Sequence, residues 1–434
     1  MLRRIAILLL LALPALAQKP ATVTLLHFSD YHSHALPFVT DDGERGGIAR
    51  AVRYLRDERR RGALVFNGGD TINKGAPAWS DKYGCAEWPW LNGIASAMAF
   101  GNHDADYGLE RFHRCRDRVA YPILSANTAG FARYAVFPVR GVRIGVFAVA
   151  GPDFPQLVKV PGLQFGDPVA AAREVVRDLR EKERVDAVVL IGHEHQEADY
   201  ALARAVPGID LIFGTHSHLR RELEKIPGTE TWFISPFQYL AFISRVELTI
   251  ENHRVTAVRG RLVPVDASMP EDRGVARRVR AMQRALERDP QYRELFAPIG
   301  KLDAMLPVAS LATMTLDAMR AATQSDVALS TMSSFRRPLP AGTLTMELLR
   351  GALPYDNEIV VCSMSGDALR RLLDAVQETY VAGAETLDPN RTYRVATTDY
   401  LAFVAYKEVF RCDAQKTGLR AREELRKRLG RAEG

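Results

Sequence analysis

The feature that most constrains the fold is a regular alternation of short apolar runs with longer stretches of helical composition, from Val23 to about Val265. The runs of strand length are 23–28, 63–67, 142–150, 185–191 and 209–213, and the helical stretches include 48–61 and 169–182. Apolar runs of this length are typical of strands buried on both faces, and strands that alternate with helices favour a sheet covered by helices. The alternation therefore predicts an α/β fold.

The chain has 434 residues, a length typical of two or three domains. Pro264 to Pro270 interrupt the alternation, and the Arg-rich run 271–288 predicts an exposed connecting helix. From about Ile299 a second pattern follows, with helices expected at 311–322, 346–353 and 366–376 and strands at 326–329, 359–364 and 393–397. We therefore expect a domain over 22–266, a connecting helix over 267–296, and a smaller α+β domain over 297–430.

The N-terminus has the pattern of a secretory signal, which we expect over residues 1–17. Arg3 and Arg4 precede the apolar run Ile5–Leu13, and Ala15-Leu16-Ala17 has the small residues of a cleavage site. The apolar run is too short to span a bilayer, and no Cys follows it to carry a lipid. The pattern predicts a periplasmic or secreted protein with no membrane anchor.

Composition narrows the range of partners. Lys and Arg number 58 against 52 Asp and Glu, an excess too small to indicate a nucleic-acid polymer as partner. Four cysteines in an exported chain can form disulfides in three pairings. We favour one bridge in each half, Cys85 with Cys115 and Cys362 with Cys412, while free buried thiols remain the alternative. The sequence predicts no oligomeric state.

Five short motifs carry residue types that ligate metals, and each follows a strand-like run. They are Asp30-Tyr31-His32, Gly68-Gly69-Asp70, Gly101-Asn102-His103-Asp104, Gly192-His193 and Gly214-Thr215-His216-Ser217-His218. One such motif alone is weak evidence, but the carboxyl ends of strands in an α/β sheet line one crevice, where five loops can converge. Imidazole, carboxylate and amide ligands together suit Zn, Mn, Fe or Co better than Mg or Ca, and of these we favour Mn or Zn. We expect a site for two divalent ions.

The order and spacing of these motifs over roughly Val23–His218 resemble the calcineurin-like metallophosphoesterases, and among them the secreted 5′-nucleotidase family. The resemblance implies a four-layer α/β sandwich with a smaller substrate domain. It also implies a role for each motif residue. The first ion would be held by Asp30, His32 and His218, the second by Asn102, His193 and His216, and Asp70 would bridge both.

The same resemblance implies that His103 is catalytic and that Asp106 orients it. Residues spaced i, i+3 can contact each other on a helical turn. His195 follows the ligand His193 by two residues, and we consider it a possible lining residue of the site. The remaining histidines fit no motif, and we expect structural roles for them; they are His27, His34, His113 and His253.

The second domain resembles the substrate domain of that family over roughly Ser325–Thr398. The resemblance implies that Tyr355 and Tyr400 stack on a nucleobase and that Arg336 pairs with phosphate. A place for the tyrosines in the domain core is the alternative. The family's Asn-x-Gly-Gly-x-Arg segment keeps only its Arg, as Arg336 or Arg337, and its Gly-Gly-Asp-Gly segment is absent after Tyr400. Nucleotide specificity is therefore less well supported than phosphoester chemistry.

The resulting hypothesis is an exported dinuclear-metal phosphoesterase that hydrolyses nucleoside 5′-monophosphates or related small phosphate esters. A second hypothesis keeps the metals and changes the substrate to a cyclic nucleotide, a non-nucleotide phosphate or a sulfur ester. A third is a binding protein without turnover. The complete set of ligand residue types, together with His103 and Asp106, favours an enzyme over the third hypothesis.

Overall fold

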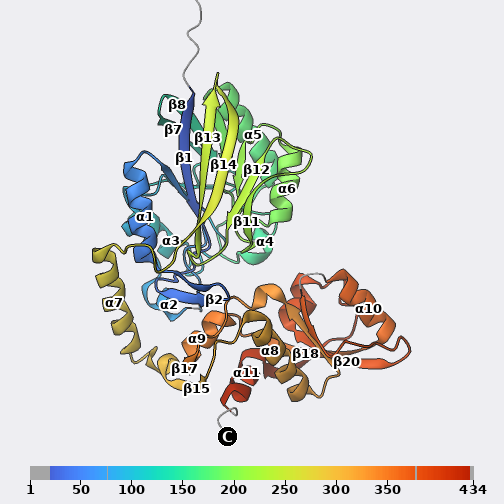
Figure 1. The fold of residues 1–434 in the computed structure, drawn as a ribbon. Helices are drawn as coiled ribbons and strands as arrows, with labels where there is room; N and C mark the ends of the chain where they lie inside the picture. The colour runs from blue at the N-terminus through green and yellow to red at the C-terminus, as the bar shows by residue number, and fades with distance from the viewer. Residues whose placement is uncertain (1–19, 76, 377–378, 431–434) are drawn as a thin grey trace, which may run out of the picture.

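The computed structural model describes residues 20–75, 77–376 and 379–430. The signal sequence predicted over residues 1–17 lies outside the described residues. Two six-stranded sheets form the larger part of the molecule (Figure 1). The first has the order β14 (Arg254–Pro264), β13 (Phe242–Glu251), β1 (Ala21–Phe28), β4 (Leu64–Asn67), β5 (Ala97–Ala99) and β6 (Ile123–Leu124). The second has the order β11 (Arg220–Lys225), β12 (Trp232–Pro236), β10 (Leu211–Phe213), β9 (Ala187–Leu190), β8 (Val142–Phe147) and β7 (Tyr134–Val139).

The centre of each sheet is parallel. In the first sheet β1, β4, β5 and β6 run parallel, and in the second β8, β9, β10 and β12 do. Antiparallel strands occupy the edges, where β13 pairs with both β1 and β14, while β7 and β11 flank the second sheet. The parallel strands point their carboxyl ends toward one edge of the sandwich, which becomes the site.

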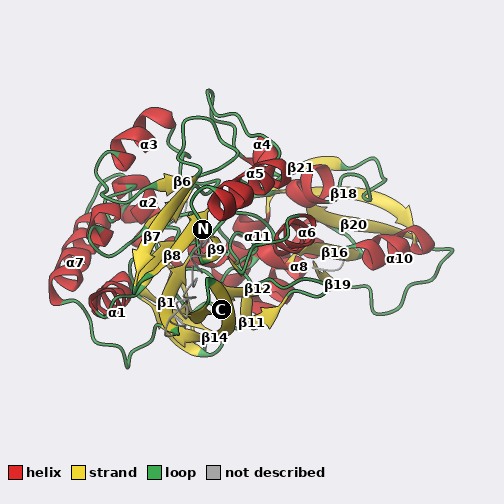
Figure 2. Ribbon diagram, turned by 90° about the horizontal axis from the view of Figure 1, so that it is seen from above, coloured by secondary structure: helices red, strands yellow, loops and turns green. Residues whose placement is uncertain are grey.

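The two sheets pack face to face and helices cover both outer faces. Between the sheets lies one apolar cluster, with Leu25 and Phe66 from the first sheet and Val146 and Phe213 from the second. The helices of the first outer face are α1 (Ile48–Arg60), α2 (Ala78–Tyr83) and α3 (Leu109–Arg116), and those of the second are α5 (Pro168–Glu181) and α6 (Gln196–Ala205). Figure 2 shows these two groups of helices on opposite sides of the strands. The predicted four-layer α/β sandwich is confirmed.

Local sequence explains where the helices begin and which faces they bury. Asp167 caps α5, accepting a hydrogen bond from the Ala170 N–H at 2.9 Å, and Pro168 opens the helix. Val175, Val176 and Leu179 then fall on the face that packs against the second sheet. Two short elements complete this unit: the hairpin β2 (Pro37–Thr40) and β3 (Gly43–Gly46), and α4 (Phe154–Leu157).

The expected connecting helix exists as α7 (Arg273–Glu287), but the prediction that it is simply exposed is wrong. Val275, Ala276, Val279 and Leu286 are buried in the apolar cluster that also contains the core face of α1. Asp272 caps the helix through the Val275 N–H at 2.9 Å. The few apolar residues of this Arg-rich run fall on one side of the helix, so a single stripe is enough to attach α7 to the sandwich.

The remaining elements form a smaller α+β unit. Its five-stranded sheet has the order β19 (Thr379–Ala382), β16 (Val327–Thr331), β20 (Thr392–Thr398), β18 (Glu358–Ser365) and β21 (Gln415–Arg420). A separate ribbon pairs β15 (Pro298–Leu302) with β17 (Gly342–Thr345). The helices are α8 (Val308–Thr323), α9 (Met346–Ala352), α10 (Gly366–Ala375) and α11 (Ala421–Gly430). β14 ends at Pro264 and β15 starts at Pro298, close to the predicted domain limits of 266 and 297, which stay a prediction.

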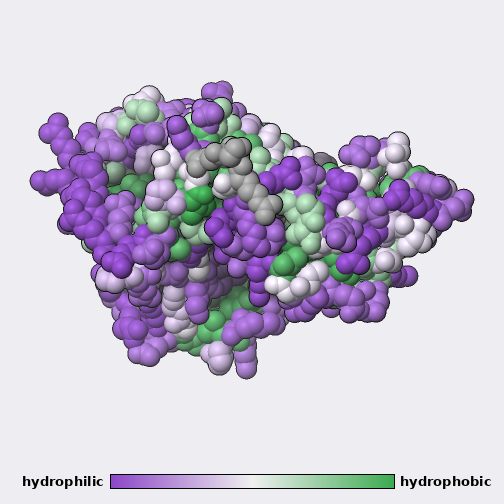
Figure 3. Space-filling view, turned by 90° about the horizontal axis from the view of Figure 1, so that it is seen from below, coloured by the Kyte–Doolittle hydropathy of each residue, from purple (hydrophilic) through white to green (hydrophobic). Residues whose placement is uncertain are grey.

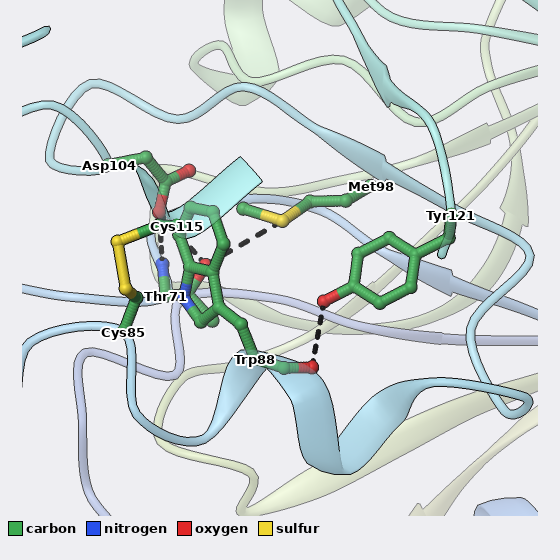
Figure 4. The surroundings of a disulfide bond; sticks show 7 residues. All are labelled: Thr71, Cys85, Trp88, Met98, Asp104, Cys115 and Tyr121. Atoms are coloured by element: carbon green, nitrogen blue, oxygen red, sulfur yellow. Dashed lines mark hydrogen bonds between the residues drawn. A yellow bond between two sulfur atoms is a disulfide. The ribbon is translucent and has the colours of Figure 1, made fainter. Parts of the chain in front are cut away.

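Both favoured disulfides are present. Cys85 joins Cys115 with a Cα–Cα distance of 5.9 Å, and Cys362 joins Cys412 at 6.1 Å. The first bridge lies against Trp88, Thr71 and Asp104 (Figure 4). It closes the stretch of chain that carries Asn102, His103 and Asp106. The alternative of free buried thiols is wrong.

We expect the Cys85→Ser/Cys115→Ser double variant to lose about 3–4 kcal/mol in its free energy of unfolding, because the bridge limits the entropy of an unfolded loop. Urea denaturation of both proteins measures this difference. The Cys362→Ser/Cys412→Ser variant is the matched control for a bridge away from the metal-ligand loops. Peptide mapping without reductant that links one half of the chain to the other would contradict both pairings.

No helix among the described residues is long and apolar enough to cross a membrane. Figure 3 shows one face of the molecule, on which hydrophobic side chains form small separate groups among hydrophilic ones.

Candidate metal centre

All five predicted motifs lie at the same edge of the sandwich. The first three follow β1, β4 and β5, which are parallel neighbours in one sheet, and the other two follow β9 and β10, which are parallel neighbours in the second sheet. Main-chain hydrogen bonds tie the loops together, for example from the Asp30 N–H to the Gly69 carbonyl at 3.1 Å and from the His32 N–H to the Asp70 carbonyl at 2.9 Å. The parallel pairing brings segments nearly two hundred residues apart to one place.

The backbone at these residues is strained. Asp30, His32, Asp70, His216 and His218 have φ angles between +47° and +53°. Non-glycine residues seldom adopt this region, at a cost of roughly 1–3 kcal/mol each, and such residues cluster at functional sites. Gly69 is required by close approach, since a Cβ there would lie 2.7 Å from the Gly101 nitrogen.

The first expected ligand group is assembled. Asp30, His32 and His218 offer donor atoms within 4.8 Å of one another. The His218 Nε2 lies 3.1 Å from Asp30 Oδ1 and 3.1 Å from His32 Nε2. Asp30 and His32 are almost wholly buried.

The second expected ligand group is assembled around Asp70. Asp70, His193 and His216 also offer donor atoms within 4.8 Å of one another. Asp70 Oδ2 lies 3.2 Å from His193 Nε2 and 3.8 Å from His32 Nε2, so this carboxylate stands between the two groups. That is the position a bridging ligand needs.

The donor atoms fit divalent cations. Among the described residues, Asp30 Oδ1, Asn102 Oδ1 and His193 Nε2 are buried without a hydrogen-bond partner. Buried polar atoms are costly unless they are satisfied, and metal coordination is one way to satisfy them. Oxygen and imidazole donors together suit divalent transition-metal ions. Asn102, the predicted amide ligand, lines the same cavity as Asp70, His216 and His218.

The pKa values of the expected histidine ligands also fit a bound cation. Burial lowers the pKa of His32 to about 3, which keeps the imidazole neutral as a metal ligand must be. For His193, burial acts in the same direction, but the charges of Asp70 and Asp30 outweigh it and raise the pKa to about 9. The buried carboxylates thus draw positive charge to this point, and a divalent cation would supply it.

His103 and Asp106 form the expected pair. The Nδ1 of His103 lies 2.8 Å from Asp106 Oδ2, and the His103 main-chain N–H donates to Asp70 Oδ1 at 2.8 Å. Burial lowers the pKa of His103, but Asp70 and Asp106 outweigh it and raise the pKa to about 10. Ions beside Asp70 would neutralise part of that charge, so we expect a lower value in the metal-loaded protein.

Asp104, the last residue of its motif, has no predicted role in the sequence but organises the loops. Its carboxylate accepts hydrogen bonds from the main-chain N–H groups of Asp70, Thr71 and Gly101 at 2.8–3.1 Å and from the Thr71 hydroxyl at 2.9 Å. Figure 4 shows the contact with Thr71 beside the first disulfide. A side chain that accepts from two loops fixes their separation.

The centre opens into a cavity of about 320 Å³ that both units line. The smaller unit contributes Arg336, Tyr355 and Tyr400. The guanidinium of Arg336 contacts the His218 ring, and its Nη2 lies 3.3 Å from the Tyr355 hydroxyl. Tyr355 and Tyr400 are 38% and 40% exposed, so neither belongs to the buried core. All three predicted substrate residues therefore line the same cavity as the metal-ligand groups.

Asp153 is a residue of the site that sequence reasoning missed. It follows β8, and its Oδ2 lies 3.0 Å from His216 Nε2 and 3.4 Å from His195 Nε2. Burial raises its pKa, but hydrogen bonds from His195 and His216 outweigh burial and hold the pKa well below its usual range. Its place after a parallel strand, like that of the five motifs, was the available signal. His195 lines the cavity, as considered above.

The four histidines without a motif lie outside the two expected ligand groups. His27 is buried and stacks on Phe213, and His34 stacks on Tyr239. His113 is exposed on α3. His253 pairs with Asp186 at 2.6 Å, at the start of β9 and therefore at the opposite end of the strand from the site.

Known protein families match both units. A calcineurin-like phosphoesterase model matches residues 23–220, the range that contains all seven expected ligands. A model of the 5′-nucleotidase C-terminal domain matches residues 305–383, which include Arg336 and Tyr355.

Individual relatives are distant but cover most of the chain. Protein UshA of Yersinia enterocolitica is 24% identical, over 88% of this chain and 86% of its own. A 5′-nucleotidase of Vibrio cholerae is 25% identical, over 83% and 76%. Among solved structures, a Thermus thermophilus 5′-nucleotidase precursor aligns with a TM-score of 0.74 at 22% identity, over 95% of this chain and 97% of its own. The sulfate thiohydrolase SoxB of T. thermophilus aligns with a TM-score of 0.73 at 20% identity, over 94% of each chain. These structural alignments establish a shared fold.

Proposed function

We propose, on the premise that this chain belongs to the 5′-nucleotidase family, that it uses two divalent ions, Mn or Zn, to hydrolyse small phosphate esters. Membership makes the chain a hydrolase that acts on phosphoester bonds. The observation that carries the dinuclear proposal is the position of Asp70, within 3.2 Å of one ligand group and 3.8 Å of the other. Divalent ions, when bound, polarise phosphoryl oxygens and activate water.

We assign the protein residues three tasks. Asp30, His32 and His218 hold one ion, Asn102, His193 and His216 hold the other, and Asp70 bridges them. His103, held by Asp106, donates a proton or hydrogen bond to the leaving oxygen. Arg336 stands beside His218 at the cavity, where a guanidinium can pair with phosphoryl oxygens.

For the substrate, we propose nucleoside 5′-monophosphates or related esters. Tyr355 and Tyr400 line the cavity with substantial exposure, and among the described residues no ring contact joins one to the other. The Arg336 guanidinium lies over one face of the Tyr355 ring, with its central carbon 5.7 Å from the ring centroid, so a base would stack on the opposite face. We further propose that the enzyme is exported to the periplasm or secreted, because residues 1–17 have the pattern of a secretory signal. We also propose that its two domains comprise residues 22–266 and 297–430.

A substrate panel tests this proposal. The chain without residues 1–17 is stripped of metal, reloaded with Mn²⁺ and offered nucleoside 5′-monophosphates, cyclic nucleotides, sugar phosphates, p-nitrophenyl phosphate and a thiosulfate ester. We expect phosphate release to be fastest from the nucleoside monophosphates. Turnover of the sulfur ester alone, or none with any substrate while two ions are bound, would contradict the proposal.

Stacking by the tyrosines has its own test. We expect the Tyr355→Ala/Tyr400→Ala variant to have a raised KM for a nucleoside monophosphate and a nearly unchanged KM for p-nitrophenyl phosphate. The binding free energy lost with each aromatic stacking pair should be about 0.5–1.5 kcal/mol. Phe403→Ala, which removes another exposed aromatic residue of the same unit, is the control. Equal changes with both substrates would count against stacking.

A further inference from the structure

Three of the expected imidazole ligands have their outer ring nitrogen engaged, but not by the same kind of group. His32 Nδ1 lies 3.4 Å from the Ile72 carbonyl, and His193 Nδ1 lies 2.7 Å from the Gly68 carbonyl. His216 instead places Nε2 at 3.0 Å from the carboxylate oxygen Oδ2 of Asp153. A carboxylate partner fixes the tautomer and orientation of a ligating imidazole and raises its basicity.

The loop that carries Asp153 is attached to the loop that carries His193. The Gly151 N–H donates to the His193 carbonyl at 2.9 Å, and the His193 N–H donates to the Val149 carbonyl at 2.8 Å. The Asp153 side chain is 27% exposed, and its second oxygen, Oδ1, is buried without a hydrogen-bond partner in the described chain. The main chain therefore holds the loop in place, and the Asp153 carboxylate makes its contact with His216 through Oδ2.

His195 adds a second contact to the same oxygen. Its Nε2 lies 3.4 Å from Asp153 Oδ2, its Nδ1 lies 3.4 Å from the Ser217 hydroxyl, and its ring packs edge-on against His216 with centroids 4.3 Å apart. The His195 side chain is 54% exposed. Asp153 thus stands between a buried ligand and an imidazole on the cavity wall.

We propose that Asp153 is a positioning residue for one ion of the pair. With Nε2–H donated to Asp153, Nδ1 of His216 is left to bind the ion shared with Asp70 and His193. Among the described residues, no hydrogen bond or ion pair joins Asp153 to Asp30, His32 or His218. Asp153 therefore sets the affinity for the second ion and leaves that for the first unchanged. This inference rests on the proposed function, because it requires a dinuclear centre.

A different occupant of this corner is a third cation, since Asp153, His195 and His216 also offer donor atoms within 4.8 Å of one another. Such an ion would require His216 to lose both ring protons and to bridge two metals. The 3.0 Å separation of Nε2 and Oδ2 is that of an ordinary hydrogen bond. A hydrogen-bonded Asp153 satisfies the same atoms without that loss.

The test is a Mn²⁺ titration of the metal-free chain. Isothermal calorimetry measures the number of ions and their affinities, and electron paramagnetic resonance measures whether the bound ions are isolated or paired. The wild-type chain is expected to bind two ions. The Asp153→Asn variant, which keeps the shape and loses the charge, should bind one ion with unchanged affinity and the second about 10–100-fold more weakly. The Asp153→Ala variant, which has no acceptor for the His216 N–H, should bind the second ion still more weakly. At one equivalent of Mn²⁺ the variant should give the spectrum of an isolated ion.

Asp186→Asn is the matched control, because it alters the other His–carboxylate pair, with His253, at the far end of β9; it should bind both ions as the wild type does. Unchanged affinity for both ions in Asp153→Asn would overturn the inference, as would equal weakening of both. Three ions in the wild type and two in the variant would assign the corner to a cation. If Asp153→Ala does not fold, the near-isosteric Asn variant decides. A wild-type chain that binds no ion would overturn the proposed function instead.

Discussion

Replacement of Asp70 by Ala is expected to abolish phosphoester hydrolysis and to remove the ability to bind a pair of ions. Asp70 Oδ2 lies within 3.8 Å of donor atoms from both ligand groups, and Asp70 is 1% exposed. Loss of partners that only orient a metal ligand costs about 10–100-fold, so loss of a shared ligand should cost more than about 100-fold. Activity on a phosphomonoester and elemental analysis of metal per chain measure the two effects.

The Asp70 variant needs a control for general damage to the fold. His253→Ala serves, because His253 is a histidine paired with a carboxylate and lies away from the site. We expect it to keep both ions and nearly all activity. Asp70 also accepts a hydrogen bond from the His103 N–H, so thermal unfolding of both variants should be compared. Two ions still bound per Asp70→Ala chain would contradict the bridging role.

Replacement of His103 by Ala should separate binding from chemistry. We expect both ions to remain, activity on an alkyl phosphate to fall by about 10²–10⁴-fold, and activity on p-nitrophenyl phosphate to fall much less. The reason is that an alkoxide leaves poorly without a proton, while p-nitrophenolate leaves without one. Steady-state kinetics with both esters, together with metal analysis, measure these effects.

The dependence on pH gives a second view of the same residue. Asp106 raises the pKa of His103, so the Asp106→Asn variant should have a lower pKa at His103. Because the acid must be protonated to act, activity on an alkyl ester should then decline at a lower pH than in the wild type. Equal fractional loss on both esters in His103→Ala, with metals intact, would mean that His103 acts on the phosphoryl group or the nucleophile.

Local sequence determined five central strands and two helices of the sandwich. The strand expected at 23–28 corresponds to β1 (Ala21–Phe28), the helix expected at 48–61 to α1 (Ile48–Arg60), and the helix expected at 169–182 to α5 (Pro168–Glu181). Continuous apolar runs and a capping Asp–Pro pair are local signals, so they can be recognised without knowing which residues lie nearby in the folded protein. The amphipathic stripe of α7 was missed because its four buried apolar residues lie among many Arg and give a weak signal.

The candidate metal ligands could also be predicted from the sequence. The carboxyl ends of parallel strands meet at one edge, so residue types placed after such strands converge whatever the rest of the chain does. The glycines in these motifs also indicate that the loops approach each other closely, since a Cβ at Gly69 would lie too near the Gly101 nitrogen. The motifs thus predicted which residues lie together.

Which atoms face one another was decided only by the tertiary structure. No local pattern pairs β1 with β13, whose partners Ala21 and Ile250 are far apart in sequence, and none brings Arg336 to His218 across the two units. The same holds for Asp153, a single acidic residue after a strand, whose meaning depends on the ring nitrogen of His216 that it meets. Sequence specifies residue types, caps and apolar faces because these depend on neighbours along the chain. Distances between distant side chains depend on how sheets and units pack, and that packing alone gave Asp153 its partner.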